Sequence, residues 1–435
     1  MRGLPPIRSA SRVRRWDAVI LGSALPGLVA AIRLGMRGLR VLILEEDAAA
    51  ARFPGLREPF LMTGTGSNGV LGSCLKALGI PLIDRRRIRA EFPTYQVALP
   101  RARVDVGDAE WTVEELDAWQ LAPEAAAREL VASLRRGAED QQRALLGSDA
   151  RASARRLPRL AKVVAMSAAR GEARAHAGSD AADPLERASG GAGPLAAFCA
   201  AQLRALSDFA ETPPPAPIRT HLLGGALGGA AEIEGSPRWL RELFEQRIRS
   251  LYGEFRELRG AFRLVSAGNQ PAVQLERAPE VCAGRALLVN APLPALRDAI
   301  REGPLPELLK GPDASHRRVS VHWRGPRRAL PDAMAARVIR VGDPAQPIAG
   351  TNLIRLRVLG NAGDAAAVDL IASAVVSIDA CAEAATDAIE SGVASLLPLG
   401  REGWLRVEGP TPRWDRDELL ADPPAPTAWP GEPSL

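Results

Sequence analysis

The sequence has very little lysine and no cluster of basic residues. Only three of its 56 basic residues are lysine, and the arginines are spread over 435 residues among 51 acidic ones. A protein that binds nucleic acid gathers positive charge on one face or along one helix. The formal charge of +5 therefore does not indicate a nucleic-acid partner, and we expect none.

Cysteine and histidine are also scarce, with four of each. The cysteines form no CxxC pair, and the histidines do not have the spacing of metal ligands. We therefore expect neither a disulfide framework nor a metal site, and free thiols fit a reducing cytoplasm. The residues concerned are Cys74, Cys199, Cys282 and Cys381, and His176, His221, His316 and His322.

A run long enough to cross a membrane is missing too. Basic residues within 12–15 precede an apolar run over 18–32, an order that imitates a signal peptide. Two glycines and a proline interrupt this run, and it is shorter than the roughly 20 apolar residues that span a bilayer. We interpret residues 1–15 as a basic extension and expect a cytoplasmic protein.

The same region has the order of a dinucleotide-binding unit. Residues 17–21 (DAVIL) are almost all apolar, which is typical of a strand buried in a parallel sheet. GSALPG then predicts a tight turn over 22–27, followed by a helix over 28–36 and a second strand over 39–44. Two acidic residues stand at the end of that strand.

Each part of this unit has a physical purpose. Gly22 allows the turn, Gly27 allows helix and strand to approach, and Pro26 suits a first helical turn. Glu45, 23 residues after Gly22, has the spacing of a carboxylate that binds the ribose of an adenosine, which favours FAD or NAD over NADP. Ala24 replaces the middle glycine of the fingerprint and is expected to weaken binding. The predicted contacts are Gly22, Ser23, Ala24, Leu25, Pro26, Gly27, Glu45 and Glu46.

Later segments favour FAD. A helix is predicted over 235–253, strands near 261–266 and 272–276, and a buried strand over 284–290 that ends in Asn-Ala-Pro and precedes a helix. With the N-terminal unit, this order resembles the FAD-dependent phytoene desaturase and amine oxidase superfamily. The resemblance implies a glycine-rich turn at 224–229, Val265 in a strand beside the adenine, and Ala291 and Arg52 near the cofactor.

The resemblance also implies the fold class. We expect an α/β protein with a Rossmann-like FAD-binding domain, whose parallel sheet has added antiparallel strands, and an α+β substrate domain with a helical cap. The patterns within the substrate domain are a hairpin over 94–108, helices over 112–211 with loops at 177–194 and 212–217, and alternating strands near 319–324 and 354–358. The predicted divisions are a 1–15 extension, an FAD domain (16–93 and 222–310), a substrate domain (94–221 and 311–405) and a Pro-rich tail (406–435).

The implied function is hydride transfer from a small, apolar organic substrate to FAD. No catalytic residue can be nominated from the sequence, and a peripheral membrane contact and the oligomeric state stay open. The alternative is a non-catalytic or truncated relative that acts as a binding or partner subunit. Ala24 and a C-terminus without the family's glycine-rich closing segment favour this alternative. An NAD-linked dehydrogenase is disfavoured, because no second βαβ half and no His/Asp or Tyr/Lys pair is visible.

Overall fold

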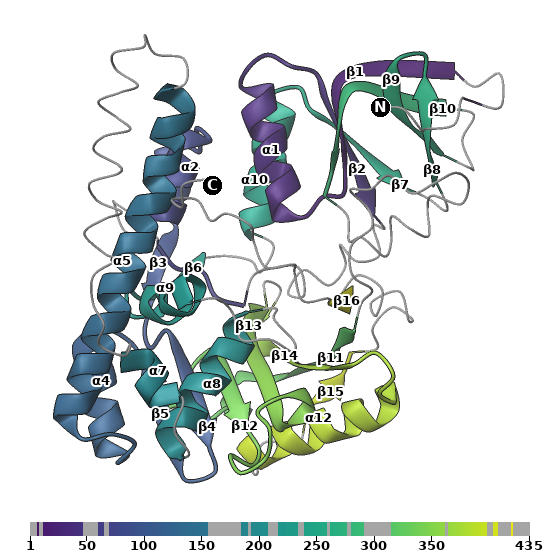
Figure 1. Cartoon of the computed structure of the whole chain (residues 1–435). Helices are drawn as coiled ribbons and strands as arrows, with labels where there is room; N and C mark the ends of the chain where they lie inside the picture. The colour runs from purple at the N-terminus through teal and green to yellow at the C-terminus, as the bar shows by residue number, and fades with distance from the viewer. Residues whose placement is uncertain are drawn as a thin grey trace.

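The computed structural model of the chain has two parts, each built around its own sheet (Figure 1). The residues that it describes are 7, 12–46, 60–64, 69–154, 184–189, 193–207, 216–233, 239–258, 262–275, 280–290, 315–361, 364–397, 403–407 and 419–420. Among the described residues, no helix combines the length and apolarity needed to cross a membrane, and no group of side chains is suited to hold a metal ion.

The first sheet contains the predicted dinucleotide unit. Its order is β7-β2-β1-β10-β9-β8, in which the first four strands run parallel and the last two are antiparallel additions. The strands are β1 (Arg12–Leu21), β2 (Val41–Glu46), β7 (Glu254–Leu258), β8 (Phe262–Ala267), β9 (Gln270–Leu275) and β10 (Glu280–Val289). The predicted parallel sheet with added antiparallel strands is confirmed.

Two helices cover one face of this sheet. Helix α1 (Leu25–Gly35) and helix α10 (Trp239–Ser250) lie side by side (Figure 1), which confirms the helix predicted over 235–253. Ile20, Leu28 and Ile32 are fully buried between α1 and the sheet. Burial of a side chain of this size contributes about 1.5–3 kcal/mol, so the apolar spacing of α1 is enough to fix its inner face.

Strand β7 was not predicted. Its sequence, EFREL, has three charged residues, no apolar run and no regular alternation of charged and apolar residues. It nevertheless pairs in parallel with β2 at the edge of the sheet, where its charged residues are half-buried rather than fully buried.

The second sheet is assembled from distant parts of the chain. It has the order β15-β11-β14-β13-β12-β4-β5, with β16 also paired to β11. Its strands are β4 (Tyr95–Leu99), β5 (Ala102–Val106), β11 (His316–Pro326), β12 (Arg337–Val341), β13 (Leu353–Asn361), β14 (Asp364–Ser377), β15 (Leu405–Arg406) and β16 (Leu419–Leu420). The hairpin predicted over 94–108 is confirmed. Strand β16 of the expected tail joins this sheet, and β15 lies at the boundary between the predicted substrate domain and the tail.

Helices pack on both faces of the second sheet, as Figure 1 shows. One face carries α12 (Ala382–Leu396), against which Val319, Ile354 and Leu356 pack. The other face carries the predicted helical region. Its helices are α4 (Ala109–Ala118), α5 (Glu124–Ala154), α7 (Pro184–Ser189), α8 (Pro194–Leu206) and α9 (Ala216–Ala226).

Two local predictions in this region were wrong. Helix α7 lies within the stretch predicted as a loop over 177–194, because Leu185 is fully buried in the helical core. Gly224 belongs to α9 rather than to a turn, and a Cβ there would collide with the carbonyl of Leu134 on α5. This glycine serves the close packing of α5 against α9.

A small connection lies between the two parts. Strands β3 (Ile88–Glu91) and β6 (Ala230–Ile233) form a two-stranded sheet, and the short helices α2 (Val70–Ala77) and α3 (Leu82–Arg85) precede it.

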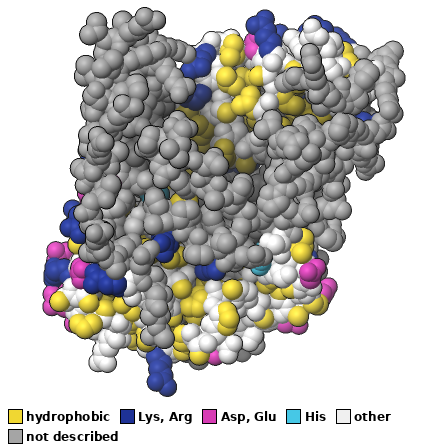
Figure 2. Space-filling view, in the orientation of Figure 1, with side chains coloured by type: hydrophobic (Ala, Val, Ile, Leu, Met, Phe, Trp, Pro, Cys, Tyr) yellow, Lys and Arg dark blue, Asp and Glu magenta, His cyan; other side chains and the backbone are white. Residues whose placement is uncertain are grey.

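On the face drawn in Figure 2, basic side chains lie at several separate places among apolar and acidic ones.

Candidate functional site

The candidate site lies where β1 and β2 end and α1 begins. Strand β1 ends at Leu21, and Gly22 turns the chain with a φ of +99°, a conformation that favours glycine. The Gly22 amide donates to the Leu44 carbonyl over 2.9 Å, which ties this turn to the end of β2. Helix α1 then starts at Leu25 without a side-chain cap, so its N-terminus offers backbone amides and the positive end of its dipole.

Ala24 disturbs this turn less than the sequence suggested. Its φ is −64°, an ordinary value for any residue, and its side chain is exposed. The backbone therefore does not require glycine at this position. The methyl group only adds bulk on the side where a ligand would approach.

Gly27 is required by a contact that the sequence did not indicate. A Cβ at Gly27 would collide with the side-chain nitrogen of Asn290 and lie 2.9 Å from the Gly22 carbonyl oxygen. Asn290 follows β10, and its Nδ2 donates to the Ala24 carbonyl over 3.1 Å. Its backbone amide also donates to the Leu21 carbonyl over 2.7 Å. Asn290 thus fixes the turn from the neighbouring strand.

Glu45, the predicted ribose acceptor, is bonded to an arginine. Nη2 of Arg241, on α10, lies 2.8 Å from Oε1 of Glu45 and 2.9 Å from Oγ of Ser23. Its Nη1 donates to the Ser23 carbonyl over 2.8 Å, and its Nε donates to Glu245 over 2.8 Å. One guanidinium group therefore joins the turn after β1, the end of β2 and helix α10.

The side chain of Glu45 is partly shielded from solvent. Burial raises the pKa of Glu45 above its usual range, and the charge of Arg241 only partly offsets this rise. Ser23, on the other side of the same guanidinium, is 2% exposed. A carboxylate in this position gains from any further hydrogen-bond donor, such as a sugar hydroxyl.

The structure brings most of the predicted residues together. The turn over 22–27 and Glu45 form one cradle, and Glu46 pairs through its backbone with Leu258 in β7. Val265 is different, because β8 lies at the edge of the sheet opposite β7 and its side chain is buried in a separate apolar cluster. The structure thus does not place Val265 with Glu45. Arg52 and Ala291 lie outside the described residues.

Two residues of the cradle were missed by the sequence analysis. The i,i+4 spacing of Arg241 and Glu245 predicts a pair along the helix, but nothing local shows that the arginine also reaches Glu45. Asn290 was noted only as part of a strand end. Asn290 directly follows β10, and the parallel pairing of β10 with β1 brings Asn290 to the turn that follows β1.

The cradle fits the adenosine and pyrophosphate half of FAD in three respects. The backbone turns sharply at Gly22, the N-terminus of α1 has no side-chain cap, and an acid ends β2. Arg241 adds a positive charge beside both Ser23 and Glu45. A bound ribose would have to share Glu45 with this guanidinium or displace it.

Comparison with known proteins gives a likeness of fold. No protein-family model matches the chain, and no curated protein matches it in sequence. Two solved structures resemble it over most of their length. A protein from Pyrococcus furiosus has 13% identity and a TM-score of 0.51, covering 91% of this chain and 87% of the other. An oxidoreductase from Methanosarcina mazei has 12% identity and a TM-score of 0.52, with the same coverage. At these identities the chain shares the mixed α/β fold of these proteins.

Proposed function

We propose that the chain binds FAD through the cradle of Gly22, the N-terminus of α1 and Glu45, and acts as an FAD-dependent oxidoreductase. The observation that carries this proposal is the joint presence of these three features at the carboxyl ends of β1 and β2. In an open parallel sheet, ligands bind at this edge. An amine oxidase or desaturase type of reaction on an apolar substrate is the finer proposal, and entry of such a substrate from a membrane surface would suit it.

The residues of the cradle would each do a separate part of the work. Backbone amides at the start of α1 would hold the pyrophosphate, and Glu45 would accept hydrogen bonds from the ribose. Asn290 would keep the turn in place through its bond to the Ala24 carbonyl. Bound FAD would supply the chemistry, by accepting a hydride from the substrate.

The test is the affinity of the full chain for FAD and for ADP, measured by titration calorimetry. We expect both to bind in competition, because both would use the same cradle, and we expect bound flavin to colour the protein. Glu45→Gln should weaken both about ten-fold or more, since a hydrogen bond to a charged group contributes about 1.5–3 kcal/mol. Glu114→Gln, on the exposed side of α4, is the matched control and should bind normally.

One observation favours a second function, that of a relative which no longer binds nucleotide. Arg241 already bonds to Ser23 and Glu45, which are the groups that a nucleotide would use. The two functions differ in one measurement. If folded wild-type protein binds neither ADP nor FAD while Arg241→Ala binds ADP, the guanidinium has replaced the nucleotide and the chain acts as a binding or partner subunit.

A further inference from the structure

The ends of α1 and α10 and the residues around α3 form a basic surface on the first part of the protein. Its three segments, 33–40, 76–89 and 247–252, together carry ten basic residues and a single acidic one, Asp84. We expected no basic cluster from the sequence, because these segments lie far apart in the chain. The basic residues are Arg33, Arg37, Arg40, Lys76, Arg85, Arg86, Arg87, Arg89, Arg247 and Arg249.

Two contacts hold the three segments side by side. A Cβ at Gly35, at the end of α1, would lie 3.1 Å from the Cβ of Leu251, just beyond α10. Nε of Arg247, on α10, donates to the Leu78 carbonyl over 3.2 Å. Leu78 and Leu251 also pack in the same apolar cluster beneath α1 and α10. The segments therefore present one continuous surface.

Large apolar side chains stand among these charges. Ile83 is 70% exposed, Leu82 is 54% exposed and Met36 is 44% exposed. Single exposed apolar residues are common, but here they lie in the same segments as the basic residues. On the face drawn in Figure 2, basic side chains flank apolar ones at the upper end of the first part. The basic surface thus combines positive charge with apolar side chains.

Tyr252 is the most unusual member of the basic surface. Its side chain is 92% exposed, and its φ is +61°, in the left-handed region that favours glycine or asparagine. Its amide donates to the Arg249 carbonyl over 3.0 Å at the end of α10. Gly38, with a φ of +75°, follows the end of α1 without this strain. The exposed ring of Tyr252 adds little packing in return, which points to a role outside the fold.

Helix dipoles account for only part of the positive charge. Arg33, Arg247 and Arg249 lie in the last turns of α1 and α10, where a positive side chain stabilises the helix. Arg40 directly precedes β2 and Arg89 lies in β3, and both are exposed. A helix dipole also gives no reason for exposed apolar side chains. The combination therefore needs another explanation.

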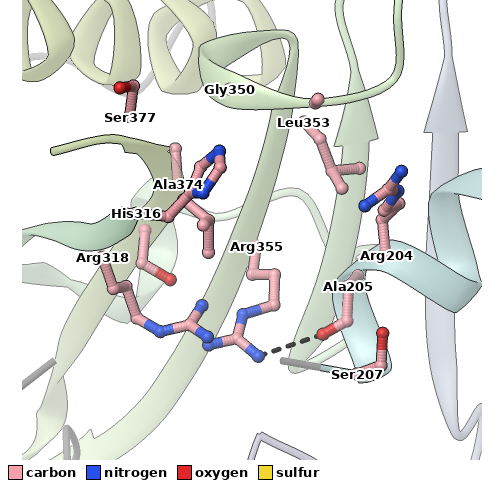
Figure 3. Close-up of a pocket in the computed structure, with 13 residues that line it drawn as sticks. Arg204, Ala205, Ser207, His316, Arg318, Gly350, Leu353, Arg355, Ala374 and Ser377 are labelled. Carbon is pink, nitrogen blue, oxygen red and sulfur yellow. Dashed lines mark hydrogen bonds between the residues drawn. The ribbon is translucent and has the colours of Figure 1, made fainter. Parts of the chain in front are cut away.

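Arginines also meet inside the second part, where one of them holds elements together. Figure 3 shows a cavity of about 80 Å³ between the C-terminal end of α8 and the strands β11, β13 and β14, with Arg318 and Arg355 in its lining. Nη1 of Arg355 donates to the Ala205 carbonyl over 3.0 Å, and its guanidinium lies 5.3 Å from the ring centroid of Phe60. Arg355 thus serves packing, whereas most side chains of the basic surface are exposed.

We propose that the basic surface docks on a membrane surface that contains anionic lipid. Its arginines would contact the lipid phosphates, and Leu82, Ile83 and Met36 would enter the layer between headgroups and acyl chains. Tyr252 suits this boundary, because its ring is apolar and its hydroxyl is polar. Nucleic acid also attracts arginine, but aliphatic side chains offer its bases neither stacking nor hydrogen bonds. The apolar side chains therefore favour lipid.

The basic surface lies at the opposite end of the first sheet from the cradle. Helix α1 begins at the cradle and ends in the basic surface, and its 11 residues span about 16 Å. Docking would thus leave the cradle uncovered. Membrane docking goes beyond the proposed function. Vesicle binding can be measured whether or not FAD binds, so each proposal can fail alone.

The test is co-sedimentation of the full chain with vesicles of phosphatidylcholine, with and without phosphatidylserine. We expect binding to the vesicles that contain phosphatidylserine, little binding to phosphatidylcholine alone, and weaker binding at high salt. Arg86→Gln should weaken binding about five-fold, the contribution of one arginine near an anionic surface. Ile83→Ser should weaken it about five- to ten-fold, because an apolar side chain no longer enters the lipid.

Tyr252→Asn separates binding from folding. Asparagine accepts the left-handed backbone at this position more readily than tyrosine, so the variant should be at least as stable as wild type in urea denaturation. It should nevertheless bind the vesicles with phosphatidylserine less tightly, because the exposed ring is lost. Unchanged binding in this variant would remove Tyr252 from the docking surface and contradict the proposal.

Matched controls lie on the second part of the protein. Arg101→Gln changes an exposed turn between β4 and β5, and Leu405→Ser changes a side chain on β15 that is 72% exposed. Both should bind as wild type does. The proposal is overturned if the full chain does not bind the vesicles with phosphatidylserine, or if the two controls weaken binding as much as Arg86→Gln and Ile83→Ser. Tighter binding to a DNA duplex or to polyglutamate than to vesicles, unaffected by Ile83→Ser, would also overturn it.

Discussion

Removal of the Arg241 side chain should cost more stability than any surface arginine on the same helix. Arg241 is 14% exposed, and its partners Glu45 and Glu245 are 27% and 17% exposed. Loss of one partner from a fully buried pair costs about 3–5 kcal/mol, since the remaining charge stays buried. Here some solvent reaches all three groups, so we expect Arg241→Ala to lower the free energy of unfolding by about 2 kcal/mol.

The measurement is urea denaturation at neutral pH, followed by circular dichroism. The matched control is Arg249→Ala, also on α10, whose side chain is 61% exposed and lies 3.6 Å from Glu245. This control should lose less than about 1 kcal/mol, because exposed pairs contribute little. Equal losses in the two variants, or a loss below about 0.5 kcal/mol in Arg241→Ala, would refute the view that one guanidinium joins β1, β2 and α10.

Two further predictions concern packing and pH. Gly27→Ala should lower the free energy of unfolding by about 1–3 kcal/mol, because its methyl group would meet Asn290 and the Gly22 carbonyl. Gly360→Ala is the control and should change this free energy little, because the space around Gly360 is open. Urea denaturation measures both free energies. For Asp369, burial raises the pKa, but the bonds from His322 and Arg324 outweigh it and leave the pKa below the usual 3.8. Because the pKa of Asp369 is lower in the folded state, its ionised form stabilises the fold above pH 3.8. This stabilisation is lost as the pH falls through the native pKa. Asp369→Asn should therefore be less stable than wild type by about 1 kcal/mol at pH 7 and equal to it in strong acid. A difference that persists unchanged in strong acid would contradict this assignment.

Much of the architecture could be predicted from local patterns. The unit from β1 to β2, the hairpin of β4 and β5, helix α10 and the alternating strands β11 and β13 each have a periodicity or turn signal of their own. The exceptions have a shared cause. Strand β7 has three charged residues among five, and α7 has Gly/Ser/Asp-rich flanks, so each forms because of what it packs against rather than because of its own sequence.

The candidate site divides in the same way. Gly22 and Glu45 could be found from the sequence because the positions of a turn and a strand end depend on residues close to them in the chain. Arg241 and Asn290 could not, since they contact Glu45 and Ala24 across 196 and 266 residues of sequence separation. The family resemblance implied that Val265 lies in a strand beside the adenine, whereas the strand order puts β8 at the edge of the sheet opposite β7.

The sequence by itself determined that a βαβ unit with a glycine turn and a terminal acid forms, because hydrophobic period and turn chemistry act over a few residues. Tertiary structure alone decided which side chains meet. It brought Arg241 to Glu45 by packing α10 against α1, and it brought Arg318 and Arg355 to one cavity by the register of β11, β14 and β13. Pairing between strands depends on the burial of whole faces, and no local pattern specifies it.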